Sequence, residues 1–137
     1  MLTIVAFVLA LGLLIAVHEY GHYRMAVACG VKVLRFSIGF GKTLARWQPQ
    51  GSPTEFVIGA FPLGGFVKML DEREAPVVES ERHLAFNTQP LRSRVAIVAA
   101  GPLANLLLAV ILYSIVNWTG VLQAAPILAS PEAGSIA

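Results

Sequence analysis

The first hydrophobic run of the chain begins at its first residue. Residues 1–17 carry no charged side chain, and the apolar pattern continues to Cys29, just before Gly30, a common kind of C-terminal helix cap. A helix from Leu2 to Cys29 would be about 42 Å long, and a hydrocarbon core is about 30 Å thick. No basic residue precedes the run, which disfavours a cleaved signal peptide. We predict a transmembrane helix over residues 1–30.

A second hydrophobic run lies near the other end of the chain. Residues 95–116 are uncharged and stand between Arg94 and Trp118. A basic residue at one end and an aromatic residue at the other are typical of the anchors at the two faces of a bilayer. We predict a second transmembrane helix over residues 95–117, and therefore an α-helical membrane protein.

The region between the runs, residues 31–94, is more polar and has strand-like segments. Aromatic and β-branched residues gather in Val33–Phe40, Glu55–Ala60 and Gly65–Leu70. This pattern predicts a membrane-associated β-hairpin loop, followed by an acidic surface loop over 71–81. The turns are expected at glycines and prolines, namely Gly39, Gly41, Gly51, Pro53, Gly59, Pro62, Gly64 and Gly65.

Charge sets the expected topology. All ten Lys and Arg residues lie between Arg24 and Arg94, so the positive-inside rule predicts a cytoplasmic loop and periplasmic or extracellular chain ends. Only 13% of residues are charged and the mean hydropathy is +0.70, which indicates a membrane protein in contact with lipid. The basic residues alternate with acidic ones and no recognition motif appears, which argues against nucleic-acid binding.

The strongest chemical signal is the sequence His18-Glu19-Tyr20-Gly21-His22 inside the first hydrophobic run. Two histidines four residues apart lie on one face of a helix and can bind one Zn²⁺ through their ring nitrogens. Glu19 is then placed to accept a proton from water that the zinc activates. Ionisable residues within a membrane are usually functional. We therefore predict His18 and His22 as metal ligands and Glu19 as the catalytic base.

The predicted zinc site lacks one ligand, because a catalytic zinc takes three protein ligands and one open position. The remaining candidates in this chain all lie in the hydrophilic loop, where ordinary solvated charges are expected: Asp71, Glu72, Glu74, Glu79, Glu81 and His83. We therefore expect the third ligand to be absent from this chain.

Asn105 is the one strongly polar side chain in the middle of the second run. An amide in a bilayer normally faces a hydrogen-bonding partner. Gly101 and Pro102 nearby would let another helix or a substrate approach closely. Two interpretations remain open: an interhelical hydrogen bond, or contact with the substrate backbone.

Four motifs together resemble the site-2 protease family of regulated intramembrane zinc metalloproteases. The motifs follow one another in the family's order and are spread over most of the chain, at residues 18–22, 36–41, 62–69 and 100–105. The resemblance implies that His18 and His22 bind zinc and that Glu19 is the general base. It places the third ligand in a Leu-Asp-Gly motif of a later helix, which this chain lacks. Residues 130–134 resemble the entrance to a PDZ-like domain, so residues 118–137 are expected to be a periplasmic tail that begins one.

The expected function is cleavage of transmembrane protein substrates, with this fragment inactive by itself. The family implies membrane-anchored anti-sigma-factor-like regulators and signal-peptide remnants. An open edge of the hairpin could hold an extended substrate by strand addition, with Gly64, Gly65 and Asn105 as tentative substrate-binding residues. A hairpin that only packs on lipid headgroups is the other interpretation. The alternative function is a non-catalytic membrane metal-binding or transport protein.

Overall fold

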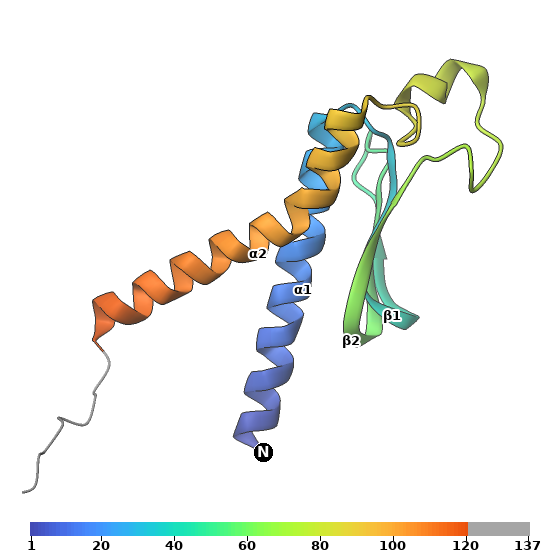
Figure 1. Ribbon diagram of the computed structural model, residues 1–137. Helices are drawn as coiled ribbons and strands as arrows, with labels where there is room; N and C mark the ends of the chain where they lie inside the picture. Colours follow the sequence, from blue (N-terminus) through green and yellow to red (C-terminus); the bar gives the residue numbers. More distant parts are fainter. Residues whose placement is uncertain (121–137) are drawn as a thin grey trace, which may run out of the picture.

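Residues 1–120 are described by the computed structural model, which consists of two long helices, a long β-hairpin and one short 3₁₀ helix (Figure 1). Residues 121–137, with the expected start of a PDZ-like domain, lie outside this range. Both predicted helices and the predicted hairpin are confirmed. In chain order the elements are α1 (Leu2–Ala28), β1 (Val33–Trp47), β2 (Glu55–Met69), the 3₁₀ helix η1 (Glu79–Leu84) and α2 (Leu91–Thr119).

Both long helices are apolar enough to span a membrane. Their most hydrophobic segments have mean hydropathies of 2.3 for α1 and 2.5 for α2, and most of their side chains face outward. The helix α1 ends as predicted: Gly30 has a φ of 77°, and Val31 N–H donates to Ala26 O at 2.9 Å. The helix α2 begins earlier than predicted, directly after Pro90, whose fixed φ is compatible with the residue that precedes a helix.

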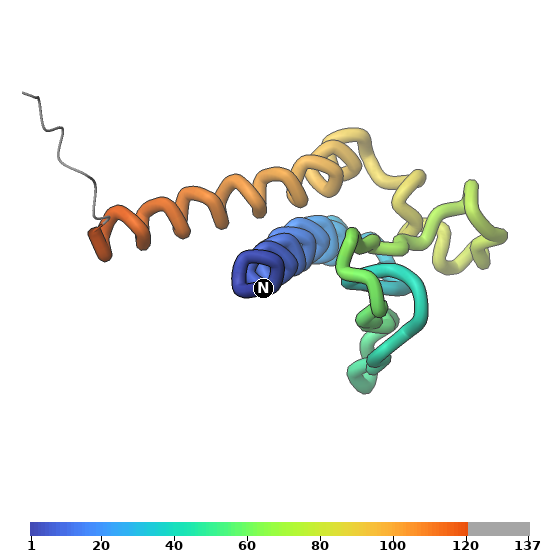
Figure 2. The backbone as a smooth tube through the Cα atoms, turned by 90° about the horizontal axis from the view of Figure 1, so that it is seen from below, coloured from blue at the N-terminus to red at the C-terminus, as the bar shows by residue number. Residues whose placement is uncertain are grey.

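The two helices lie against each other at their loop-side ends and diverge toward the other side (Figures 1 and 2). Their closest approach is at Gly21 of α1. A Cβ placed there would lie 2.5 Å from Ala100 O and 2.8 Å from Ala104 Cβ of α2. Small residues allow such close contact between membrane helices. This contact brings the His motif against α2.

The two strands are longer and more bent than the sequence predicted. Ser37 in the first half of β1 pairs with both Phe66 and Val57 of β2, while Trp47 in the second half pairs with Phe56. The expected turns agree with this pairing. Gly51 and Pro53 lie in the connection between the strands, and because Val57 pairs with both Ser37 and Arg46, β1 reverses direction between those two residues, where Gly39 and Gly41 lie. Ser37 pairs with both Val57 and Phe66, so β2 also reverses direction between these two residues, where Gly59, Pro62, Gly64 and Gly65 lie; Gly39 and Gly41 have positive φ.

The hairpin is attached to α1 through a small buried core. Val33 at the start of β1 packs with Ala26, Val31 and Ile97, and Val33 and Ile97 are each only 1% exposed. Tyr23 of α1 has its ring centroid 5.6 Å from those of two hairpin phenylalanines, Phe36 and Phe56. These contacts fix the hairpin beside the His motif.

Candidate metal centre

The two histidines of the motif point at a common position. Since four residues make about one helical turn, both side chains leave α1 on the same face, with ring centroids 4.8 Å apart. The Nε2 atom of His18 lies 3.1 Å from the Nε2 atom of His22. Two nitrogens bound tetrahedrally to one Zn²⁺ at about 2.0–2.1 Å would be about 3.3 Å apart. The pair therefore fits two ligands of a single zinc ion.

His22 is held in a metal-binding orientation by α2. Its Nδ1 atom lies 2.7 Å from the carbonyl oxygen of Ile97. A carbonyl can only accept a hydrogen bond, so Nδ1 carries the proton and the lone pair of Nε2 stays free. The ring fits against α2 because residue 101 is glycine: any Cβ there would overlap Nε2 of His22.

His18 contacts a different group of α2. Its Nδ1 atom lies 3.3 Å from Nδ2 of Asn105, while Oδ1 of Asn105 is buried without a hydrogen-bond partner in residues 1–120. The structure thus brings Asn105, a predicted site residue, to the metal site through an interhelical contact. An orphaned buried oxygen beside a histidine is a feature that a bound metal would explain.

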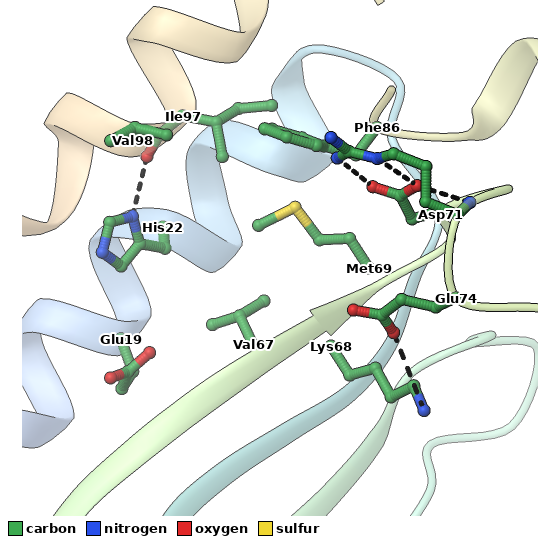
Figure 3. Close-up of a pocket in the computed structure, with 11 residues that line it drawn as sticks. Glu19, His22, Val67, Lys68, Met69, Asp71, Glu74, Phe86, Ile97 and Val98 are labelled. Carbon is green, nitrogen blue, oxygen red and sulfur yellow. Dashed lines mark hydrogen bonds and ion pairs between the residues drawn. The ribbon is translucent and has the colours of Figure 1, made fainter. Parts of the chain in front are cut away.

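The side chain of Glu19 extends from α1 toward β2. A Cβ placed on Gly65 would lie 2.7 Å from Cγ of Glu19, so the side chain packs on the strand backbone. Glu19 lines two cavities: one of about 370 Å³ shared with His22 and Val67, shown in Figure 3, and one of about 360 Å³ shared with His18 and Gly64. The predicted base therefore faces cavities that lie between the hairpin and the helices.

The loop acids do not complete the zinc site. No group of three His, Cys, Asp or Glu side chains with metal-binding geometry exists within residues 1–120. Asp71 lines the same cavity as His22 but bonds to Arg73, with Oδ1 2.9 Å from Nε (Figure 3). The expectation that the third ligand comes from elsewhere remains a prediction.

Sequence reasoning missed the carbonyl of Ile97, because a backbone acceptor has no residue-type signature. The nearby signal was Gly101 with Pro102, which predicted close approach without showing that His22 is what approaches. Sequence reasoning also missed that the side chain of Glu19 packs on the backbone at Gly65, since Gly65 was proposed only as a contact for substrate.

A pair of apolar helices holds two convergent histidines with a glutamate beside them, an arrangement that fits two ligands of a zinc ion and a nearby carboxylate. The chain belongs to peptidase family M50, whose sequence profile matches residues 6–133, and this agrees with the resemblance to site-2 proteases.

Three relatives illustrate the similarity. The chain is 52% identical over 132 residues to the regulator of sigma-E protease RseP of Escherichia coli K12, covering 96% of the chain and 29% of the relative. It is 50% identical over 136 residues to the protease RseP of Yersinia pestis, and this match covers 98% of the chain and 30% of the relative. A Ralstonia nicotianae protein, named as a candidate zinc metalloprotease, is 51% identical to the chain over 144 residues. This match covers 100% of the chain and 31% of the relative. The chain therefore spans less than a third of the length of these relatives.

Proposed function

We propose that this chain forms the catalytic N-terminal part of an intramembrane zinc metalloendopeptidase. The observation that carries the proposal is the 3.1 Å separation of the Nε2 atoms of His18 and His22, with Glu19 beside them lining two cavities. The arrangement combines two metal-binding nitrogens with one carboxylate inside a helix long enough to cross a membrane.

Each residue has a distinct role in the proposed reaction. A zinc ion bound here would activate a water molecule for attack on a peptide carbonyl. Glu19 accepts the proton of that water and returns it to the leaving amine. His22 is oriented by Ile97 O so that Nε2 faces the metal. A third ligand is supplied by a residue outside 1–120, and residues 1–120 alone are therefore inactive.

The hairpin is proposed to hold the substrate in an extended form, because a helical segment keeps its carbonyls in internal hydrogen bonds. The segment 65–69 of β2 pairs with the first half of β1 on one side, and no further strand pairs with it in residues 1–120. Gly65 of this segment and the preceding Gly64 line a cavity that is also lined by His18, Glu19 and Asn105. A strand added at this edge would pass beside the catalytic base, with pairing independent of sequence.

The proposed topology places the hairpin loop, residues 31–94, in the cytoplasm of a bacterium and the other ends of α1 and α2 at the periplasmic side. The ten Lys and Arg residues all lie within 24–94, on the loop side. Residues 1–30 and 95–117 form the two spans in the inner membrane. Residues 118–137 belong to a periplasmic region that begins a PDZ-like domain.

The proposed substrates are transmembrane segments of membrane-anchored regulators, including anti-sigma-factor-like proteins, and signal-peptide remnants. The Escherichia coli relative is named a regulator of sigma-E protease, which supports regulators as a substrate class. The unpaired strand edge at 65–69 also supports transmembrane segments of varied sequence as substrates, since main-chain pairing accepts many sequences.

The test uses the full-length protein in vesicles with a single-span membrane protein as substrate. Glu19→Gln should lower the cleavage rate at least 100-fold while the bound zinc remains unchanged, because the general base contributes about 10²–10⁴-fold and is no ligand. His18→Ala should lose both cleavage and zinc. Glu79→Gln, in the exposed loop, is the matched control and should behave as wild type. Undiminished cleavage by Glu19→Gln would overturn the proposal, and retained metal transport by that variant would favour a carrier.

A further inference from the structure

The outer nitrogens of the two motif histidines face chemically different groups. Nδ1 of His22 faces a backbone carbonyl, which can only accept a hydrogen bond. Nδ1 of His18 faces the carboxamide of Asn105, which can donate through Nδ2 or accept through Oδ1. Only His18 therefore has a neighbour that can change its hydrogen-bonding role.

The observed contacts form one continuous chain of hydrogen bonds. Asn105 Nδ2 donates to His18 Nδ1 at 3.3 Å, and the His18 proton then lies on Nε2. That proton is directed at His22 Nε2, 3.1 Å away, and His22 Nδ1 donates to Ile97 O at 2.7 Å. This order satisfies the three ring contacts but gives His18 no free lone pair at Nε2.

Zinc ligation by both Nε2 atoms requires the opposite arrangement at His18. The proton must move from Nε2 to Nδ1, so the imidazole stays neutral, and Nδ1–H then needs an acceptor. Oδ1 of Asn105 is buried and without a partner in the part of the chain that the structure describes. A half-turn of the carboxamide about its terminal bond places Oδ1 where Nδ2 lies and provides that acceptor.

We propose that Asn105 is the positioning residue of His18, and that its carboxamide turns over when the metal binds. The turned carboxamide accepts from Nδ1–H through Oδ1, which would leave Nε2 free to hold the zinc. This inference rests on the zinc site of the proposed function. Asn105 takes the place for His18 that Ile97 O takes for His22, and hydrogen-bond partners of this kind commonly change metal affinity 10–100-fold.

The experiment measures the zinc affinity of full-length protein in detergent by competition with a chelator. Asn105→Leu, which has neither donor nor acceptor, should bind zinc 10–100-fold more weakly. Asn105→Asp keeps an acceptor oxygen and should bind at least as tightly as wild type. Asn117→Ala removes another amide of α2, whose Nδ2 donates to Tyr113 O away from the site, and should leave the affinity unchanged.

A second readout follows the tautomer of His18 directly, through ring ¹⁵N chemical shifts of zinc-free protein. Wild type should show the proton on Nε2, and Asn105→Asp should move it to Nδ1, because an ionised carboxylate only accepts. A purely structural role for Asn105 would leave the tautomer unmoved. This measurement also tests the positioning role of Asn105 if the Asn105→Leu variant fails to fold.

The outcomes separate this inference from the proposed function. Tight zinc binding by wild type together with equal affinity of Asn105→Leu would overturn the role of Asn105 and leave the protease proposal standing. An unchanged His18 tautomer in Asn105→Asp would do the same. Failure of wild type itself to bind zinc would overturn the proposed function and this inference with it.

Discussion

The imidazole of His22 lies so close to Gly101 that any Cβ at position 101 would overlap the ring. The metal-binding nitrogen itself, Nε2, is the atom that the Cβ would meet first. Helix α2 therefore does two things for one histidine: it binds Nδ1 through Ile97 O and leaves an open position for the ring one helical turn later.

Gly101→Ala should weaken zinc binding by about tenfold or more, because the ring of His22 must move away from Ile97 O to admit the methyl group. Chelator competition on the full-length protein measures this loss. Gly12→Ala is the matched control, since a Cβ at Gly12 meets nothing within 4 Å. Equal zinc affinities for the two variants would show that the ring is not constrained as described.

Gly65→Ala should impair cleavage while zinc binding stays near that of wild type. The new Cβ would lie 2.6 Å from Ser37 O and 2.7 Å from Glu19 Cγ, so it displaces the carboxylate of Glu19, the proposed base, and the strand edge but neither histidine. Misplacement by about 1 Å can lower a rate about 100-fold. Cleavage in vesicles and zinc content, measured on the same preparation, check this separation. A parallel loss of zinc would contradict it.

Thr54→Val should lower the free energy of unfolding by about 1–2 kcal/mol. Thr54 is 2% exposed, and its hydroxyl donates to Val33 O at 2.9 Å, which ties the start of β2 to the start of β1. Valine keeps the shape but leaves the carbonyl of Val33 without this partner. Denaturant unfolding in detergent measures the change. Thr43→Val on an exposed part of β1 is the control and should change it by less than about 0.5 kcal/mol.

The loop after β2 should be sensitive to acid through Asp71. Hydrogen bonds from Arg73 hold the pKa of the Asp71 carboxyl below its usual range. Since this pKa is lower when folded, its stabilising contribution is complete above the ordinary Asp pKa of about 3.9 and disappears as the pH falls through the folded value. Amide hydrogen exchange at residues 70–75 should differ between wild type and Asp71→Asn at pH 7.

That difference should vanish at the acid end of the titration, where Asp71 is protonated in both states. Glu74→Gln serves as the control, because Glu74 makes only a 4.0 Å ion pair with Lys68 at an exposed position. An exchange difference between wild type and Asp71→Asn that persists unchanged into strong acid would contradict the assignment to the carboxylate.

The site shows where sequence reasoning reached its limit. The spacing of His18 and His22 predicted their convergence, because a helix repeats every 3.6 residues whatever surrounds it. The pairing of Asn105 with His18 was one of two open interpretations, since an amide in lipid needs a partner but composition does not name one.

By itself the sequence determined the two apolar helices, the His-Glu-x-x-His chemistry and the presence of a hairpin, because length, hydropathy and helical period are local properties of the chain. Only the tertiary structure decided that Ser37 pairs with both Val57 and Phe66, since the order of segments in a sheet depends on contacts between residues far apart in the chain. It also decided that the ring of His22 packs against Gly101 and hydrogen-bonds to Ile97 O. Those contacts join residues 75 or more positions apart, and their geometry depends on how closely α1 and α2 pack.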